Sequence, residues 1–246
     1  MEPQVLTALP VFNEAKHVDD VLDDVLRYSR HVLVVDDGST DGTKEVLARR
    51  RDIEVVTHSR NWGYGAALTT AFDFALRKSY DILVTIDCDR QHEPQRIPEF
   101  VRACVDRQAD IVSGSRYLQA FSGDSRPPED RRRINGILTA EINSRLGLHL
   151  TDAFCGFKAY HVPALAKFDL IETGYAMPLE FWVQAASLDL KIVEIPVPLI
   201  YLEEERSFGG SLDNSDIRLG VYRDVLARSI RRHRRRCENR LCCGVE

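Results

Sequence analysis

The sequence predicts an α/β protein whose mainly parallel central sheet carries helices on both faces. Over the first 115 residues, short runs rich in β-branched residues alternate with segments whose apolar residues recur every three or four positions. A length of 246 residues, 44% of them hydrophobic, is enough for one sizeable core. We find no internal repeat and no linker that divides the chain.

The first half holds five runs of strand length, namely Val5–Phe12, His31–Val35, Ile53–Thr57, Asp81–Ile86 and Asp110–Ser113. Between them, the apolar spacing predicts helices over Val18–Leu26 and Ile97–Val105. Strands and helices that alternate in this way are joined by right-handed crossovers into a parallel sheet. Ligands of such sheets bind outside the carboxyl ends of the strands, so the segments that follow the strands are the candidate site.

The second half is less regular. We expect long loops over residues 115–133 and 203–215, which are polar and contain glycine. The remaining predicted elements are a helix over Arg133–Leu146, a strand over Gly156–Tyr160, a helix over Glu180–Leu188, a strand over Lys191–Leu199 and a terminal helix that includes Ile217 and Val221. The predicted organisation is a domain of residues 1–215 followed by a basic helix or tail of residues 216–246.

Composition excludes several classes of protein. Lys and Arg number 33 against 38 Asp and Glu, and the net charge of -5 argues against a nucleic-acid binder. No run approaches the ~20 apolar residues of a membrane helix. The six cysteines show no zinc-site spacing. These observations predict a soluble cytoplasmic protein.

Carboxylates follow the second predicted strand. Asp36 and Asp37 begin the segment DDGSTDG and could accept hydrogen bonds from a nucleobase or from ribose hydroxyls. Asp, Gly, Ser and Thr are equally the residues of a turn and helix cap, and this loop alone does not separate the two interpretations.

The fourth predicted strand ends in DCDRQH. Asp87 and Asp89 alternate, which in an extended segment places both carboxylates on one side. With the Gln91 amide oxygen, they suit Mg²⁺ or Mn²⁺ bridging a diphosphate. Such an ion would assist the departure of a nucleoside diphosphate. The alternative is a solvated acidic turn.

The segment RNWGYGAA at residues 60–67 precedes a helix. Its small residues would allow the backbone to approach a ligand, and a helix N-terminus favours anions. It matches no nucleotide-binding glycine motif, and taken by itself a helix-entry turn explains it.

Together these motifs resemble the family 2 glycosyltransferases of the GT-A fold, and within them the dolichyl-phosphate mannose synthase and polyprenyl-phosphate glycosyltransferase branch. The ordered matches are PVFNE at 10–14, VVDDGSTDGT at 34–43, RNWGYGAA at 60–67, DCDRQH at 87–92 and GSR at 114–116. The resemblance covers about residues 4–212. It implies a single GT-A domain that takes a nucleotide sugar.

The resemblance also implies roles for individual residues. The nucleoside pocket would be lined by Pro10, Phe12, Glu14, Asp36 and Asp37, with Asp87 continuing toward the ribose and phosphates. Asp89 and Gln91 would hold Mg²⁺ or Mn²⁺. Arg116 would meet the acceptor phosphate, and Arg131 and Arg206 would help bind phosphate groups. Leu212 departs from the pattern, because this branch usually has a lysine there.

The expected reaction is inverting transfer of a sugar from a UDP- or GDP-linked donor to a polyprenyl-phosphate-type acceptor. A phosphate oxygen is already ionised near neutral pH and needs no base. A hydroxyl acceptor would need one, and Asp152 and Glu180 are the candidates, although a loop cap and a helix N-terminal charge also explain them. The alternatives are a soluble sugar, glycan or metabolite acceptor, and a sugar-nucleotide binding protein without turnover.

The terminal segment carries a basic cluster, formed by Arg228, Arg231, Arg232, Arg234, Arg235, Arg236 and Arg240. It could lie on anionic lipid headgroups, at roughly 1 kcal/mol per well-placed residue, and hold the enzyme at the inner membrane face. A solvated tail is the alternative interpretation.

Overall fold

The computed structural model describes residues 2–202 and 209–242, with side chains as far as residue 234. Its core is a seven-stranded sheet of order β3-β2-β1-β4-β6-β5-β7. The strands are β1 (Val5–Val11), β2 (Val32–Asp36), β3 (Glu54–Thr57), β4 (Ile82–Thr85), β5 (Ile111–Ser115), β6 (Lys158–His161) and β7 (Ile192–Pro196). The predicted α/β class with a mainly parallel central sheet is confirmed.

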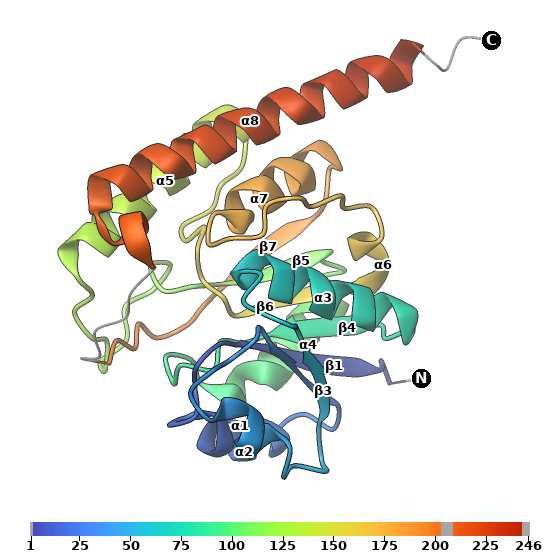
Figure 1. Cartoon of the computed structure of the whole chain (residues 1–246). Helices are drawn as coiled ribbons and strands as arrows, with labels where there is room; N and C mark the ends of the chain where they lie inside the picture. The colour runs from blue at the N-terminus through green and yellow to red at the C-terminus, as the bar shows by residue number, and fades with distance from the viewer. Residues whose placement is uncertain (1, 203–208, 243–246) are drawn as a thin grey trace.

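Helices cover both faces of the sheet (Figure 1). The helices are α1 (Val18–Leu26), α2 (Thr43–Leu47), α3 (Tyr64–Arg77), α4 (Ile97–Asp106), α5 (Glu129–Leu146), α6 (Val162–Leu165), α7 (Met177–Ser187) and α8 (Ser215–Cys242), with 3₁₀ turns at Pro94–Arg96 and Gly210–Asp213. Successive strand residues point to opposite faces. Leu6 and Leu83 therefore pack with α3 and α7, whereas Leu9 and Val84 pack with α1 and α4.

The topology brings the candidate motifs to one edge of the sheet. Strands β1, β2 and β4 are parallel, so their carboxyl ends lie together. Strand β6 runs antiparallel to both β4 and β5, and β7 is parallel to β5. The segments that follow β1, β2, β4, β5 and β7, and the segment that precedes β6, therefore all meet at this edge.

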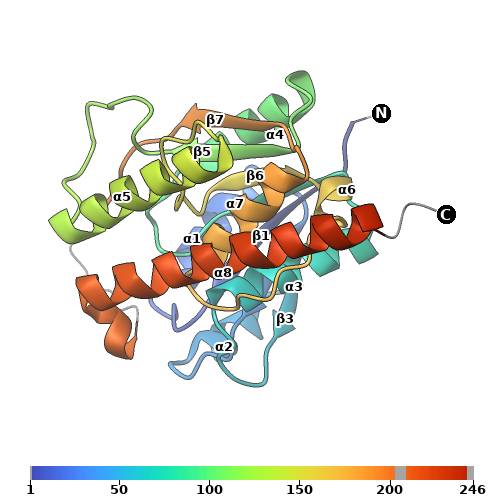
Figure 2. The ribbon, with the colours of Figure 1, turned by 90° about the horizontal axis from the view of Figure 1, so that it is seen from above.

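Helix α8 crosses the outer layer of the molecule, where it packs on α7 and runs beside α5 (Figure 2). No helix in residues 2–202 and 209–242 is long and apolar enough to cross a membrane.

Element boundaries differ from the predictions at two helices. The loop expected over residues 115–133 ends earlier, because α5 begins at Glu129, directly after Pro128. The first turn of α5 is charged, so apolar spacing does not reveal it. Helix α7 likewise begins at Met177, three residues before the predicted start.

Candidate active site

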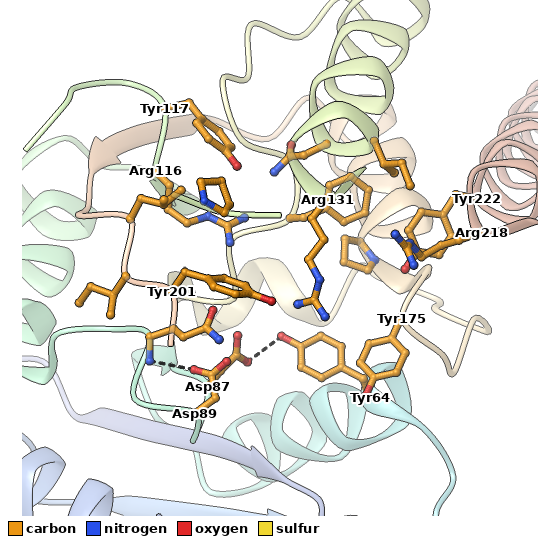
Figure 3. A pocket seen from close by; sticks show the side chains of 18 residues that line it. Tyr64, Asp87, Asp89, Arg116, Tyr117, Arg131, Tyr175, Tyr201, Arg218 and Tyr222 are labelled. Atoms are coloured by element: carbon orange, nitrogen blue, oxygen red, sulfur yellow. Dashed lines mark hydrogen bonds between the residues drawn. The ribbon is translucent and has the colours of Figure 1, made fainter. Parts of the chain in front are cut away.

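Two adjoining cavities open at this edge of the sheet. The larger has a volume of about 560 Å³ and the smaller of about 230 Å³. The two cavities share five lining residues, namely Tyr64, Asp87, Asp89, Arg131 and Tyr175. Figure 3 shows the smaller cavity, with Arg131 pointing into it between Arg116 and the Asp87–Tyr64 pair. The two cavities therefore share a wall of acidic, basic and aromatic side chains.

The segment after β1 lines the larger cavity. Pro10, Phe12 and Glu14, which the resemblance assigned to a nucleoside pocket, border it together with Asp37. Asn13 has a φ of 57° and its amide oxygen accepts from Thr40 N–H at 2.7 Å, which ties this segment to the loop after β2. The structure thus brings these four predicted residues together.

Asp37 holds the segment at residues 60–67. Its Oδ1 lies 2.7 Å from His58 Nδ1 and accepts from Trp62 N–H at 2.8 Å, while its Oδ2 accepts from Gly63 N–H at 2.8 Å. Gly63 has a φ of 108°, and a Cβ there would lie 2.3 Å from the Thr173 carbonyl oxygen. The two sequence motifs therefore form one structural unit, and glycine is required at position 63.

Asp36 is the last residue of β2 and does not line the larger cavity. Its side chain is fully buried, and its Oδ1 accepts from Ser39 N–H at 2.9 Å. Within the described residues, Oδ2 has no hydrogen-bond partner. This placement matches the turn interpretation of the DDGSTDG segment for Asp36.

Asp87 occupies the shared wall. Its Oδ1 accepts from the Tyr64 hydroxyl at 3.0 Å, and its Oδ2 lies 3.5 Å from His92 Nε2. Burial acts to raise the pKa of Asp87, but the contacts with His92 and Tyr64 and the charge of Lys158 outweigh it, so the pKa is lowered. The carboxylate is therefore ionised at neutral pH.

Asp89 and Gln91 follow on the same loop and line the smaller cavity. The chain turns between them at Arg90, whose φ is 59°, and Asp89 Oδ1 accepts from Gln91 N–H at 3.0 Å. In the described part of the chain, no three His, Cys, Asp or Glu side chains converge as a metal cage. The oxygen donors nevertheless fit Mg²⁺, which takes one or two carboxylates and completes its shell with water and substrate phosphates.

Arg116 follows β5 and faces the smaller cavity (Figure 3). Its Nε and Nη2 donate to Asp152 at 2.6 and 3.0 Å. Asp152 is fully buried and also accepts from Asn135 Nδ2 at 2.7 Å and from Phe154 N–H at 3.1 Å. Burial acts to raise its pKa, but Arg116 and these donors lower the pKa of Asp152 to about 2.

Neither predicted general base, Asp152 or Glu180, lines either of these two cavities. The Asp152 carboxylate accepts two hydrogen bonds from Arg116. It also accepts from Phe154 N–H, which is the loop cap of the alternative interpretation. Glu180, at the start of α7, is buried and accepts from Ile171 and Glu172 N–H at 2.8 and 2.7 Å. It also accepts from Arg232 Nη1 at 2.8 Å. Both carboxylates are held by hydrogen bonds within the protein and neither faces the two cavities, so this geometry disfavours the base role for both.

Two further arginines border the smaller cavity. The Arg131 guanidinium lies 5.6 Å from the centre of the Tyr201 ring. Arg218, on α8, was not predicted, and it is nearly buried, with Nη2 donating to Asp130 at 2.6 Å. The sequence does contain one indication of its burial, because Arg218 has the helical spacing that places it on the same apolar face as Tyr222 and Val225. Arg206 lies outside the described residues.

The basic cluster of α8 divides into outward and inward members. Arg228, Arg231 and Arg234 are exposed. Arg232 instead turns inward and donates to Glu180 and to Asp169 Oδ2 at 2.7 Å. The side chains of Arg235, Arg236 and Arg240 lie outside the described part. Arg232 therefore does not belong to the outward-facing part of the basic cluster.

The fold and these motifs define a glycosyltransferase with a GT-A-like fold. Residues 7–168 match the family model described as glycosyl transferase family 2, and the chain belongs to that family. It is similar to an undecaprenyl-phosphate mannosyltransferase of Micrococcus luteus, with 33% identity covering 84% of this chain and 88% of that protein. It is also similar to a polyprenol monophosphomannose synthase of Mycolicibacterium smegmatis, with 31% identity covering 89% and 85%. The predicted branch of the family is confirmed.

Solved structures support the fold. A glucosyl-3-phosphoglycerate synthase of Mycobacterium tuberculosis, in complex with Mn²⁺, UDP and glucosyl-3-phosphoglycerate, superposes with a TM-score of 0.66. The two chains are 19% identical, and the match covers 93% of this chain and 78% of that one. A structure of the same synthase with Mg²⁺ and UDP also gives a TM-score of 0.66, with 20% identity, and covers 83% and 73%.

Proposed function

We propose that this enzyme transfers a sugar from a UDP- or GDP-linked donor to a polyprenyl-phosphate-type lipid, with inversion at the anomeric carbon and with the assistance of Mg²⁺ or Mn²⁺. The observation that carries the proposal is the shared wall. An acidic pair, Asp87 and Asp89, stands between a large cavity and an arginine-bearing small one. The names of the similar mannosyltransferases support the acceptor class.

The larger cavity suits the donor. Its volume of about 560 Å³ falls in the range of small-molecule sites, and backbone and carboxylate groups of the first two motifs line it. Glu14 and Asp37 offer oxygen acceptors for nucleoside hydroxyl and N–H groups. We assign Pro10, Phe12, Glu14 and Asp37 to the nucleoside, and Asp36, the last residue of β2, to the support of the turn that follows the strand.

The smaller cavity suits an acceptor phosphate. Arg116 and Arg131 border it, and its carboxylates among the described residues are Asp87 and Asp89, which also line the larger cavity. An ionised phosphate needs arginines to hold it and no base to activate it. Apolar residues of the same lining, such as Ile134 and Phe154, could contact the first carbons of a lipid. Among the described residues, neither Asp152 nor Glu180 lines this cavity, which favours a phosphate nucleophile over a hydroxyl.

In the proposed reaction, an oxygen of the acceptor phosphate forms a bond to the anomeric carbon. The bond between that carbon and the diphosphate oxygen breaks, and the nucleoside diphosphate leaves with the electron pair. Arg116 is held by two hydrogen bonds to Asp152 and orients the incoming phosphate. Asp89 and Gln91 would hold the divalent ion, which when bound neutralises charge on the departing diphosphate.

The exposed arginines of α8 give the proposal a location. Arg228, Arg231 and Arg234 lie on the helix that also contributes Arg218 and Tyr222 to the smaller cavity. We propose that this face rests on anionic headgroups at the inner membrane surface, which would deliver a lipid acceptor to the cavity.

A transfer assay tests the proposal. Purified enzyme is incubated with UDP- and GDP-sugars, Mg²⁺ or Mn²⁺, and either a polyprenyl phosphate or a water-soluble phosphorylated acceptor. We expect glycosylated polyprenyl phosphate, loss of product with EDTA, and a large loss for Asp89→Ala. Transfer to the soluble acceptor alone would contradict the lipid assignment. Undiminished activity of Asp89→Ala would contradict the assignment of the divalent ion to Asp89.

A further inference from the structure

Tyr64 is the first residue of α3 and lines both cavities. It belongs to the segment RNWGYGAA at residues 60–67, which the sequence alone explains as a turn that enters a helix. In the structure, however, its hydroxyl donates to Asp87 Oδ1 at 3.0 Å (Figure 3). Tyrosine at this position therefore places a hydrogen-bond donor inside the wall that separates the two cavities.

The tyrosine is held from both sides. On one side, Asp37 accepts the N–H groups of Trp62 and Gly63, which fixes the backbone that enters α3. On the other side, the Tyr64 ring is stacked on Tyr175, with centroids 5.8 Å apart and an interplanar angle of 16°. The hydroxyl thus has a defined position before any ligand binds.

Asp87 depends on this donor for its orientation. Its carboxylate lies between the Tyr64 hydroxyl and His92 Nε2, on opposite oxygens. Gly156 passes so close that a Cβ there would lie 2.0 Å from Asp87 Oδ2. Three neighbours therefore determine the orientation of the Asp87 carboxylate, and of these Tyr64 is the one that borders both cavities.

We infer that Tyr64 is a positioning residue, which holds the Asp87 carboxylate in the orientation that the donor diphosphate sugar requires. This inference rests on the proposed function for the identity of the donor. Burial raises the pKa of the Tyr64 hydroxyl, with Asp87 adding to the effect, so the group stays protonated and remains a donor across the physiological range. The phenol acts through Asp87 and takes no part in bond formation.

A double-mutant cycle tests the inference. Wild type, Tyr64→Phe, Asp87→Ala and the double variant are compared for UDP and GDP binding with Mg²⁺ by calorimetry, and for kcat and both KM values. Because Tyr64→Phe removes a hydrogen bond to a charged group, we expect it to lower donor affinity or kcat by about ten- to a hundredfold. We expect less than about a twofold further loss when Asp87 is already alanine.

Tyr80→Phe is the control, because it removes a half-buried phenol that borders neither cavity. We expect it to leave donor binding and kcat unchanged. Equal losses in both Asp87 backgrounds would show that Tyr64 acts on the ligand directly and would overturn the inference. The inference would also be overturned if Tyr64→Phe lost no more donor affinity or kcat than the control variant, or if its loss were explained by a lower stability of the folded protein.

A crystal structure of Tyr64→Phe supplies a readout that needs no substrate. We expect the Asp87 carboxylate to rotate away from its place beside His92, and an unmoved carboxylate would overturn the inference. If the wild type bound neither nucleotide, the proposed donor would be wrong, whereas this structural comparison would still decide the role of Tyr64.

Discussion

Arg116 and Asp152 form a two-point ion pair in which the carboxylate is fully buried and the guanidinium borders the smaller cavity. The Asp152 carboxylate therefore lies on the buried side of the pair, and the Arg116 guanidinium lies on the side of the cavity. Asn135 adds a third donor to the same carboxylate. Asp152 therefore holds the Arg116 guanidinium in place beside the cavity, and we expect the stability of this part of the fold to depend on both partners.

Replacing Asp152 with alanine leaves Arg116 without its partner. Breaking a buried ion pair on one side costs about 3–5 kcal/mol, so we expect a loss of that size in the free energy of unfolding, measured by urea denaturation. Asp216→Ala is the control, because its pair with Arg133 is exposed and such pairs contribute less than about 1 kcal/mol. Equal effects of the two substitutions would show that the Asp152 pair is not a buried anchor.

The same pair predicts a dependence on acidic pH. The folded-state pKa of Asp152 is lowered from 3.8 to about 2, so its stabilising contribution is complete above pH 3.8 and is lost as the pH falls toward 2. The shift corresponds to about 2 kcal/mol. We expect the stability difference between wild type and Asp152→Asn to narrow by about this amount between pH 5 and pH 2. A constant difference over that range would contradict the assignment.

Gly156 should tolerate no side chain, because a Cβ would lie 2.0 Å from Asp87 Oδ2. We expect Gly156→Ala to displace Asp87 and to lower kcat/KM by at least about tenfold, since small displacements of positioned groups are costly in catalysis. The control is Gly136→Ala on α5, where a Cβ would meet nothing within 4 Å.

For Gly136→Ala we expect unchanged kcat/KM and a gain in stability of about 0.5–1 kcal/mol, from the better helix propensity of alanine. If Gly156→Ala kept full activity while folding normally, the close approach at Asp87 would have no functional consequence.

The sheet and the donor motifs were predictable because their signals are local. Each strand of β1, β2 and β4 is an apolar run followed by small and acidic residues, and parallel topology then brings those residues together. The start of α5 at Glu129 was missed because its first turn is charged and presents no apolar row. Asp36 and Asp37 are adjacent and chemically identical, and only the fold shows that Asp37 lines the cavity while Asp36 is buried at the end of β2.

The residues that complete the smaller cavity could not be predicted in the same way. Arg218 and Asn135 reach the site from helices that are distant in sequence, and their role depends on how α5 and α8 pack. Asp152 and Glu180 carry the residue type expected of a base, but their partners Arg116 and Arg232 occupy them. Such partnerships are set by tertiary contacts and leave no periodic signal in the sequence.

The arginines of α8 provide a test of the proposed membrane surface, with Arg232 as an internal contrast. Arg232 donates to the buried carboxylate of Glu180, so we expect Arg232→Ala to lower the melting temperature by several degrees. Arg231 and Arg234 are exposed, and the double substitution Arg231→Glu/Arg234→Glu should leave the melting temperature nearly unchanged. Deletion of residues 228–246 would remove both kinds of arginine and could not separate them.

Flotation with anionic and neutral vesicles measures the surface interaction directly. At roughly 1 kcal/mol for each well-placed basic residue, replacing two of them lowers the partition coefficient on anionic vesicles by at least about tenfold. The effect should shrink at high salt, because ionic strength screens exposed charges. Neutral vesicles should bind wild type and variant equally. If the double variant floated with anionic vesicles as well as the wild type, the outward face of α8 would not be the lipid-binding surface, and the acceptor would have to reach Arg116 by another approach.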